Sequence, residues 1–220
     1  MDKNRSGYTL SIIALVIAVI GVAIGYSAFS TALRVEANAT VTATEENFKV
    51  VFSDNQDSVT TNDVVPSKTP ESITATNAKI NNAGDPTISG LSAVFTEPGQ
   101  EVSYTFYVHN TGQYNAFLKS IIYQNSTDGT SPKVCKAVTA ENGATNELVQ
   151  SACEGISLET KVGNDVTTTG SQTDITGKQL SKNESETVTV TIKYATNAER
   201  ADGDFTISFG DITLDYNSFD

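Results

Sequence analysis

The stretch TVTVTIKY, residues 187–194, decides the fold class, because its side chains alternate strictly between polar and apolar. Its apolar members are Val188, Val190, Ile192 and Tyr194. Successive side chains of a β-strand point to opposite faces, so this alternation predicts a strand with one buried face. The threonines between the apolar residues also favour a strand, because β-branched side chains suit a pleated sheet.

Strand-like patterns recur on both sides of this stretch. They cover residues 47–53, 88–95, 102–108, 116–123, 156–160 and 205–216. Asn110-Thr111-Gly112 separates two of them, which predicts that 102–108 and 116–123 form a hairpin in the middle of the core. Residues 205–209 and 212–216 are out of phase by one residue, which predicts a β-bulge at Gly210-Asp211.

Eight or nine such segments, with almost no helical periodicity, predict an all-β antiparallel β-sandwich of jelly-roll or Ig-like type. A closed barrel is the alternative. The chain has no tryptophan, so the Cys-Trp-Cys core of a true immunoglobulin domain is not expected. Residues 54–87 are rich in Asp, Asn, Ser, Thr and Pro, which predicts a long connection with one strand near 73–80. Residues 125–146 are expected to form a loop.

The N-terminus is unlike the rest, because residues 6–33 carry no charged side chain and residues 10–26 read LSIIALVIAVIGVAIGY. Lys3 and Arg5 provide the basic flank that stays on the cytoplasmic side. Seventeen helical residues span about 25 Å, and the residues up to Leu33 extend the helix enough to cross a bilayer. The pattern predicts one N-terminal hydrophobic helix, a signal peptide or transmembrane anchor over 1–32, ahead of a single ectodomain over 33–220.

Two cleavage patterns compete with a retained anchor. Ala28-Phe29-Ser30 places small residues where a general signal peptidase prefers them, with cleavage before Thr31. The N-terminus from Ser6 to Leu10 also resembles that of type IV prepilins, which are cleaved after the glycine. Ile12 stands where that family carries a glutamate. This position departs from the prepilin pattern. Because the residues from Ser6 to Leu10 fit it, a type IV pilin-like subunit is kept as an alternative.

Composition limits the chemistry. Without Asp2, Lys3 and Arg5 the chain keeps 12 basic and 25 acidic side chains, a net charge of −13, so we expect no nucleic-acid partner. The single histidine, His109, and the absence of catalytic motifs predict a protein that is not an enzyme and has no catalytic residues. Asp202, Asp204 and Asp211 form a candidate Ca²⁺ site, and no other cofactor is expected.

The two cysteines, Cys135 and Cys153, both lie in the exported part, and we expect them to form a disulfide. A metal site is a weaker interpretation, because no histidine stands beside the two thiols. A catalytic thiol is weaker too, because no neighbouring residue would lower its pKa.

Strict alternation also follows the apolar segment, over residues 33–43. The apolar members are Leu33, Val35, Ala37, Ala39, Val41 and Ala43. Most of these side chains are small, which suits a strand that lies where room is limited or that inserts late into an existing groove. The strand pairs either within its own domain or with a neighbouring molecule.

Two stretches together resemble the TasA/camelysin family of exported proteins. One is the apolar segment that runs into Gly25-Tyr26-Ser27-Ala28-Phe29-Ser30, and the other runs from Glu97-Pro98-Gly99-Gln100 to Asn110-Thr111-Gly112. The resemblance covers about forty residues and implies a jelly-roll-like sandwich of matrix fibres or surface layers. It also implies donor-strand assembly, in which residues 33–43 of one subunit complete the sheet of the next.

The sequence therefore predicts a non-enzymatic surface structural protein that is exported and then anchored in the cytoplasmic membrane or released. Its expected partner is itself, in a homo-oligomer or filament, with the membrane contacted through the N-terminal helix. The alternative to the filament and to the pilin-like subunit is a monomeric anchored module for adhesion, which binds surface ligands.

Overall fold

The computed structural model describes residues 47–126, 131–138, 146–168 and 177–218. The chain divides into two units, Met1–Thr42 and Ala43–Asp220, and every element below lies in the second. The predicted N-terminal helix and the predicted strand over 33–43 lie outside the described residues. Within the described ranges, no helix has both the length and the apolar character that a bilayer crossing requires.

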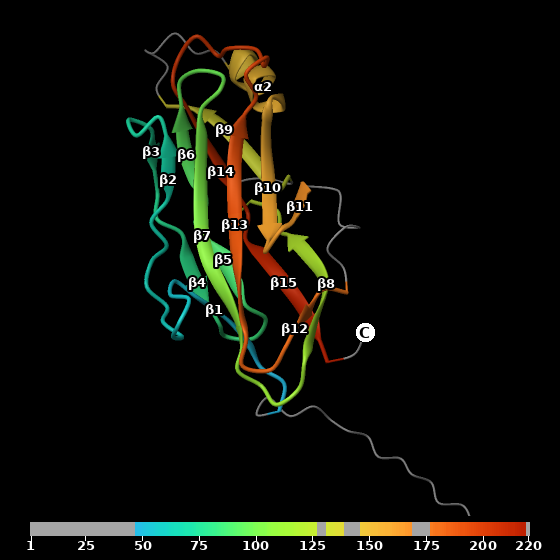
Figure 1. The fold of residues 1–220 in the computed structure, drawn as a ribbon. Coiled ribbons are helices and arrows are strands. Elements are labelled where there is room, and N and C mark those ends of the chain that lie inside the picture. Colours follow the sequence, from blue (N-terminus) through green and yellow to red (C-terminus); the bar gives the residue numbers. More distant parts are fainter. Residues whose placement is uncertain (1–46, 127–130, 139–145, 169–176, 219–220) are drawn as a thin grey trace, which may run out of the picture. The chain divides into compact units, whose positions relative to one another are not determined.

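Fifteen strands in the described part of the chain form three antiparallel sheets (Figure 1). The six-stranded sheet contains β1 Val50–Ser53, β2 Ser67–Thr69, β7 Glu101–Asn110, β10 Ile156–Val162, β11 Asp165–Thr168 and β13 Ser185–Tyr194. The five-stranded sheet contains β4 Lys79–Asn81, β5 Thr87–Ser89, β8 Ala116–Tyr123, β12 Gln179–Leu180 and β15 Ile212–Asn217. The four-stranded sheet contains β3 Thr74–Ala75, β6 Ser92–Phe95, β9 Lys133–Ala137 and β14 Phe205–Phe209. The antiparallel, predominantly β character is as predicted.

The long strands β7 and β13 form the centre of the six-stranded sheet, whose order is β1-β7-β13-β10-β11, with β2 also on β7. The predicted alternation is present, because Val188, Val190 and Ile192 of β13 are fully buried. Across the strand pair, Val190 lies opposite Tyr104 and Ile192 lies opposite Val102. Each pair is buried on the same face, so one side of this sheet is a continuous apolar surface.

The two smaller sheets follow one another along the same layer. The chain passes directly from one to the other four times, between β3 and β4, β5 and β6, β8 and β9, and β14 and β15. One core cluster joins their buried side chains to those of the six-stranded sheet. Phe95 and Phe205 of the four-stranded sheet, for example, pack on Tyr194 of β13 with ring centroids 5.9 and 5.6 Å apart.

The predicted bulge at Gly210-Asp211 is wrong, because the phase change there marks the passage between two sheets. β14 ends at Phe209 in the four-stranded sheet and β15 begins at Ile212 in the five-stranded sheet. The register irregularity of β15 lies further on, between Asp215 and Tyr216. Gly210 donates its N–H to the Pro132 carbonyl at 2.9 Å, so the junction crosses closely over neighbouring backbone.

The predicted hairpin of 102–108 with 116–123 is also wrong, because β7 and β8 belong to different sheets. Asn110 organises the passage between them. Its buried side-chain amide donates to the Tyr114 and Leu180 carbonyls at 2.8 and 3.0 Å, and its Oδ1 accepts the Gly112 N–H at 3.1 Å. Every polar atom of this amide has a partner, so the arch is fixed without pairing its two strands.

Three further segments differ from the sequence expectation. Residues 54–87 contribute one short strand to each sheet, namely β2, β3 and β4. The predicted strand over 88–95 is split into β5 and β6 at Gly90, which has a positive φ of 76°. The expected loop over 125–146 contains β9, and Asn146–Glu154 forms a helix, α2, that was not predicted.

Buried tyrosines make the fold sensitive to alkali. Burial raises the pKa of the Tyr104 and Tyr123 hydroxyls, although hydrogen bonds to Ser92 and Thr76 for Tyr104 and to Thr160 for Tyr123 oppose the shift. A raised folded-state pKa means that the unfolded chain loses these protons first. The stabilisation is therefore complete below about pH 9, is lost as pH rises through the unfolded pKa of about 10, and continues to fall toward the folded pKa values.

We expect the free energy of unfolding of the full chain in detergent to decrease between about pH 9 and about pH 11, because the unfolded tyrosines ionise there. Urea titrations at a series of pH values measure this slope. The double variant Tyr104→Phe, Tyr123→Phe should show a shallower decrease. An identical slope in both proteins would refute this origin of the alkaline sensitivity.

Candidate functional site

Strand β1 is an edge strand with an unusual burial pattern, because all four of its residues are buried. It pairs with β7 on one side and has no strand neighbour on the other side among the described residues. The Lys49 carbonyl, one residue before β1, accepts the N–H groups of Thr111 and Gly112 at 2.9 and 3.1 Å. The odd-numbered residues therefore hydrogen-bond toward β7, and the even-numbered residues direct their backbone groups outward.

At one outward-facing position, a side chain takes the place of a paired strand. Asn82 accepts the Phe52 N–H through Oδ1 at 2.8 Å and donates from Nδ2 to the Phe52 carbonyl at 2.9 Å. A carboxamide has the same donor and acceptor arrangement as a backbone peptide, so Asn82 completes the ladder at this residue. Nothing in the sequence pattern indicates this contact, since Asn82 stands in a polar segment 30 residues away.

A groove of about 330 Å³ continues along the outer side of β1. Residues 48–51 form one wall, and Asn82 and the β4–β5 turn at 84–86 form the other. Tyr216 of β15 also lines the groove. Lys49 and Asp85 supply one charge of each sign, and the lining mixes polar groups with the apolar side chains of residues such as Val50 and Pro86.

The far side of the groove is formed where β15 runs beyond its neighbour. β5 pairs only with Ile212 and Thr213, so residues 214–217 of β15 have no strand on that side in the described part of the chain. Burial raises the pKa of the Tyr216 hydroxyl, and the negative charge of Glu186 raises it further. The buried Oδ1 of Asn217 has no hydrogen-bond partner among the described residues. The groove is therefore bordered by two incompletely paired strand edges, the outer edge of β1 and the edge of β15 over residues 214–217.

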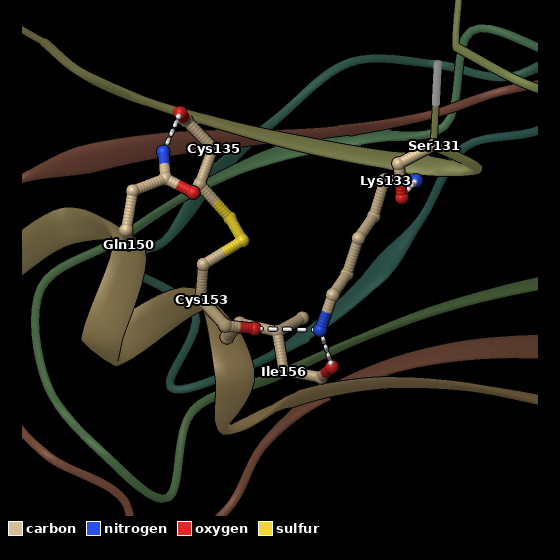
Figure 2. The surroundings of a disulfide bond; sticks show 6 residues. All are labelled: Ser131, Lys133, Cys135, Gln150, Cys153 and Ile156. Carbon is tan, nitrogen blue, oxygen red and sulfur yellow. Dashed lines mark hydrogen bonds between the residues drawn. A yellow bond between two sulfur atoms is a disulfide. The ribbon is translucent and has the colours of Figure 1, made fainter. Parts of the chain in front are cut away.

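The predicted disulfide is present and joins Cys135 of β9 to Cys153 of α2, with the Cα atoms 6.0 Å apart (Figure 2). Both cysteines are buried. Lys133 Nζ donates to the Cys153 and Ile156 carbonyls at 2.6 and 2.7 Å, at the end of the helix. Burial lowers the pKa of this lysine, and the negative charge of Glu154 opposes the shift. A disulfide of this kind is typical of an oxidising, extracytoplasmic location.

The calcium candidate is not assembled, because its three aspartates do not lie together. Asp202 and Asp204 precede β14 and Asp211 follows it, so a strand of roughly 16 Å separates them. No group of three His, Cys, Asp or Glu side chains suited to a metal ion occurs within the described ranges. Asp202 has a positive φ of 53°, which is ordinary turn geometry before a glycine.

The other predicted site residues have simpler positions. His109 lies near the end of β7, with Nε2 2.9 Å from the Asn55 carbonyl oxygen, and holds the loop that follows β1. The donor-strand candidate over 33–43 lies outside the described residues, and the described chain begins at Asn47, immediately before the groove. Comparisons with protein-family models, curated proteins and solved structures gave no match.

Proposed function

We propose that this chain is a non-enzymatic structural protein of the cell surface, similar to the TasA/camelysin proteins and built as a jelly-roll-like sandwich. Its subunits assemble head to tail when the strand over residues 33–43 of one subunit enters the groove beside β1 of the next. One observation carries this proposal: β1 is buried on both faces, yet its outer edge has no strand neighbour among the described residues. Asn82 occupies the outward backbone groups of Phe52, so within β1 the outward groups of Val50 are those that an added strand would pair with.

The alternating pattern of the donor segment and its small side chains support the proposal. Its apolar face would point toward the buried side of β1 and Tyr216, and its polar face would point to solvent. Apart from Leu33, the side chains of its apolar face are all alanine or valine, at Val35, Ala37, Ala39, Val41 and Ala43. Such small side chains suit a space of about 330 Å³.

A non-closing contact of this kind produces a filament, because each subunit offers one donor strand and one acceptor edge. The disulfide supports an extracytoplasmic place for such a filament. The competing arrangement is an anchored monomer in which residues 33–43 fold back into the groove of their own chain. It is favoured by the short link from residue 43 to Asn47, which lies beside that groove.

Mass spectrometry of the N-terminus tests the proposal, using protein recovered from cell surface and medium. A start near Thr31 is expected, because the donor strand must be released from the membrane segment before it can reach a neighbour. A start at Tyr8 would support the pilin-like alternative, and an intact Met1 would support the anchored monomer. Either of these two results would contradict strand donation.

A further inference from the structure

Helix α2 packs against β9 and β10. The helix lies in the chain between β9 of the four-stranded sheet and β10 of the six-stranded sheet, and it contributes Val149, Ala152 and Cys153 to the core. Lys133 of β9 reaches across to the carbonyls of Cys153 and Ile156, the last of which begins β10 (Figure 2). The helix therefore bridges the two sheets.

β9 is itself an edge strand, and the direction of its backbone groups can be read from its neighbours. The Val138 N–H donates to the Asp204 carbonyl, and the Pro132 carbonyl accepts the Gly210 N–H, at 3.0 and 2.9 Å. Even-numbered residues therefore hydrogen-bond toward β14, and odd-numbered residues direct their groups to the outer edge. The outward carbonyl of Cys135 accepts from Gln150 Nε2 of α2 at 3.4 Å. The outer edge of β9 thus lies under the helix.

We infer that α2, held by the Cys135–Cys153 disulfide, covers a latent interaction surface, the outer edge of β9, whose partner is the same edge of a second copy of this chain. A nine-residue helix is too short to be stable without tertiary contacts, so its position depends on the buried Val149 and Ala152 together with the disulfide and the hydrogen bonds of Gln150 and Lys133. An uncovered edge strand is a template for pairing.

The sequence of β9 suits pairing with itself. In an antiparallel pair centred on Cys135, Lys133 lies opposite Ala137 and Val134 lies opposite Lys136 of the other copy. No lysine then directly faces another lysine, and the contact is self-complementary, as a two-fold dimer requires. This surface is separate from the β1 groove and does not depend on strand donation.

The test compares the full chain in detergent micelles with and without the disulfide. A dithiol reductant transfers two electrons and two protons to the disulfide, which gives two thiols while the dithiol becomes its own disulfide. Light scattering after size exclusion should show at least about tenfold tighter dimerisation of the reduced chain and of the Cys135→Ala, Cys153→Ala variant. Any association through the β1 groove would be present in oxidised and reduced protein alike.

The specific control is Ala137→Pro. Ala137 directs its N–H to the outer edge, so proline removes a donor needed by a second copy and leaves the bonds to β14. Added to the cysteine variant, it should abolish the dimer, and in the oxidised chain it should leave the melting temperature unchanged. Dimers that persist after the Ala137→Pro substitution, or a folded cysteine variant that stays monomeric, would overturn the inference.

Hydrogen exchange covers the case in which loss of the disulfide unfolds the chain. On reduction, the amides of α2 should exchange faster, while those of β7 and β13 should stay protected. Loss of protection in all three elements would also overturn the inference, because the disulfide would then hold the whole fold and not a removable cover.

Discussion

Replacement of Gly210 by alanine should lower the free energy of unfolding by about 3 kcal/mol, among the largest effects of a single methyl group in this chain. A Cβ at this position would lie 2.1 Å from the Gln124 carbonyl oxygen and 2.6 Å from the Asn125 carbonyl carbon. Both are backbone atoms, so neither can rotate away. The junction between β14 and β15 would have to move, and with it the contact between the two smaller sheets.

Circular dichroism during heating of the full chain in detergent measures this effect, and a melting temperature lower by roughly 6–12 °C is expected. Gly84→Ala is the matched control. A Cβ there would meet nothing within 4 Å, and only the positive φ of 88° would be strained, at a cost of about 1 kcal/mol. Equal effects of the two substitutions would contradict the close crossing at Gly210.

Val41→Asp should abolish fibre formation. In the predicted donor strand Val41 is on the apolar face, so the substitution would place an unpaired carboxylate against apolar lining residues such as Val50 and Pro86. The cost of burying it is several kcal/mol, which corresponds to a loss of affinity of about a hundredfold or more. Negative-stain electron microscopy of protein recovered from cells should show no fibres.

Thr40→Asp is the control for this prediction, because it adds the same charge one residue earlier, on the polar face of the strand. Fibres of this variant should be as frequent as those of the unchanged chain. Both proteins should be exported in similar amounts and melt at similar temperatures. If the two substitutions act alike, or if neither affects the fibres, the strand is not inserted by its apolar face.

The strands with long, regular alternation could be predicted from the sequence, but their partners could not. β7 and β13 have period two over most of their length, and both are present as expected. The alternation at 205–209 correctly indicated one buried face, whereas at the start of β15 Ile212, Thr213 and Leu214 are all buried and Tyr216 is only partly buried. A phase change, however, has the same sequence pattern whether one strand bulges or two strands join different sheets, so the pattern at Gly210 does not distinguish the two.

Short strands and the helix were not predicted, because a few residues carry too little pattern. β2, β3 and β4 have two or three residues each, too few to show a period. β2 and β3 are held by pairing with longer strands, and β4 pairs with β5, which is equally short. Helix α2 did carry a helical signal, since Val149, Ala152 and Cys153 are buried at helical spacing. Its nine residues depend on the disulfide and on neighbouring side chains, which local periodicity does not reveal.

The candidate site was only partly predictable. The cysteine pair followed from composition and export, and the calcium candidate failed because sequence proximity of Asp204 and Asp211 hides the strand between them. The groove beside β1 is lined partly by Asn82 and Tyr216, which come from distant parts of the chain. Only the folded arrangement shows that both lie beside β1.

The most direct test of strand donation is photo-crosslinking from position 39 in an assembly of equal amounts of ¹⁴N- and ¹⁵N-labelled chains. Ala39 is replaced by a small aliphatic diazirine amino acid, which the space of about 330 Å³ can hold, and the cross-linked peptides are identified by mass spectrometry. Strand donation predicts cross-links from the donor segment of one label to β1 or the β4–β5 turn of the other label. Cross-links confined to a single label, or directed to another surface, would contradict it.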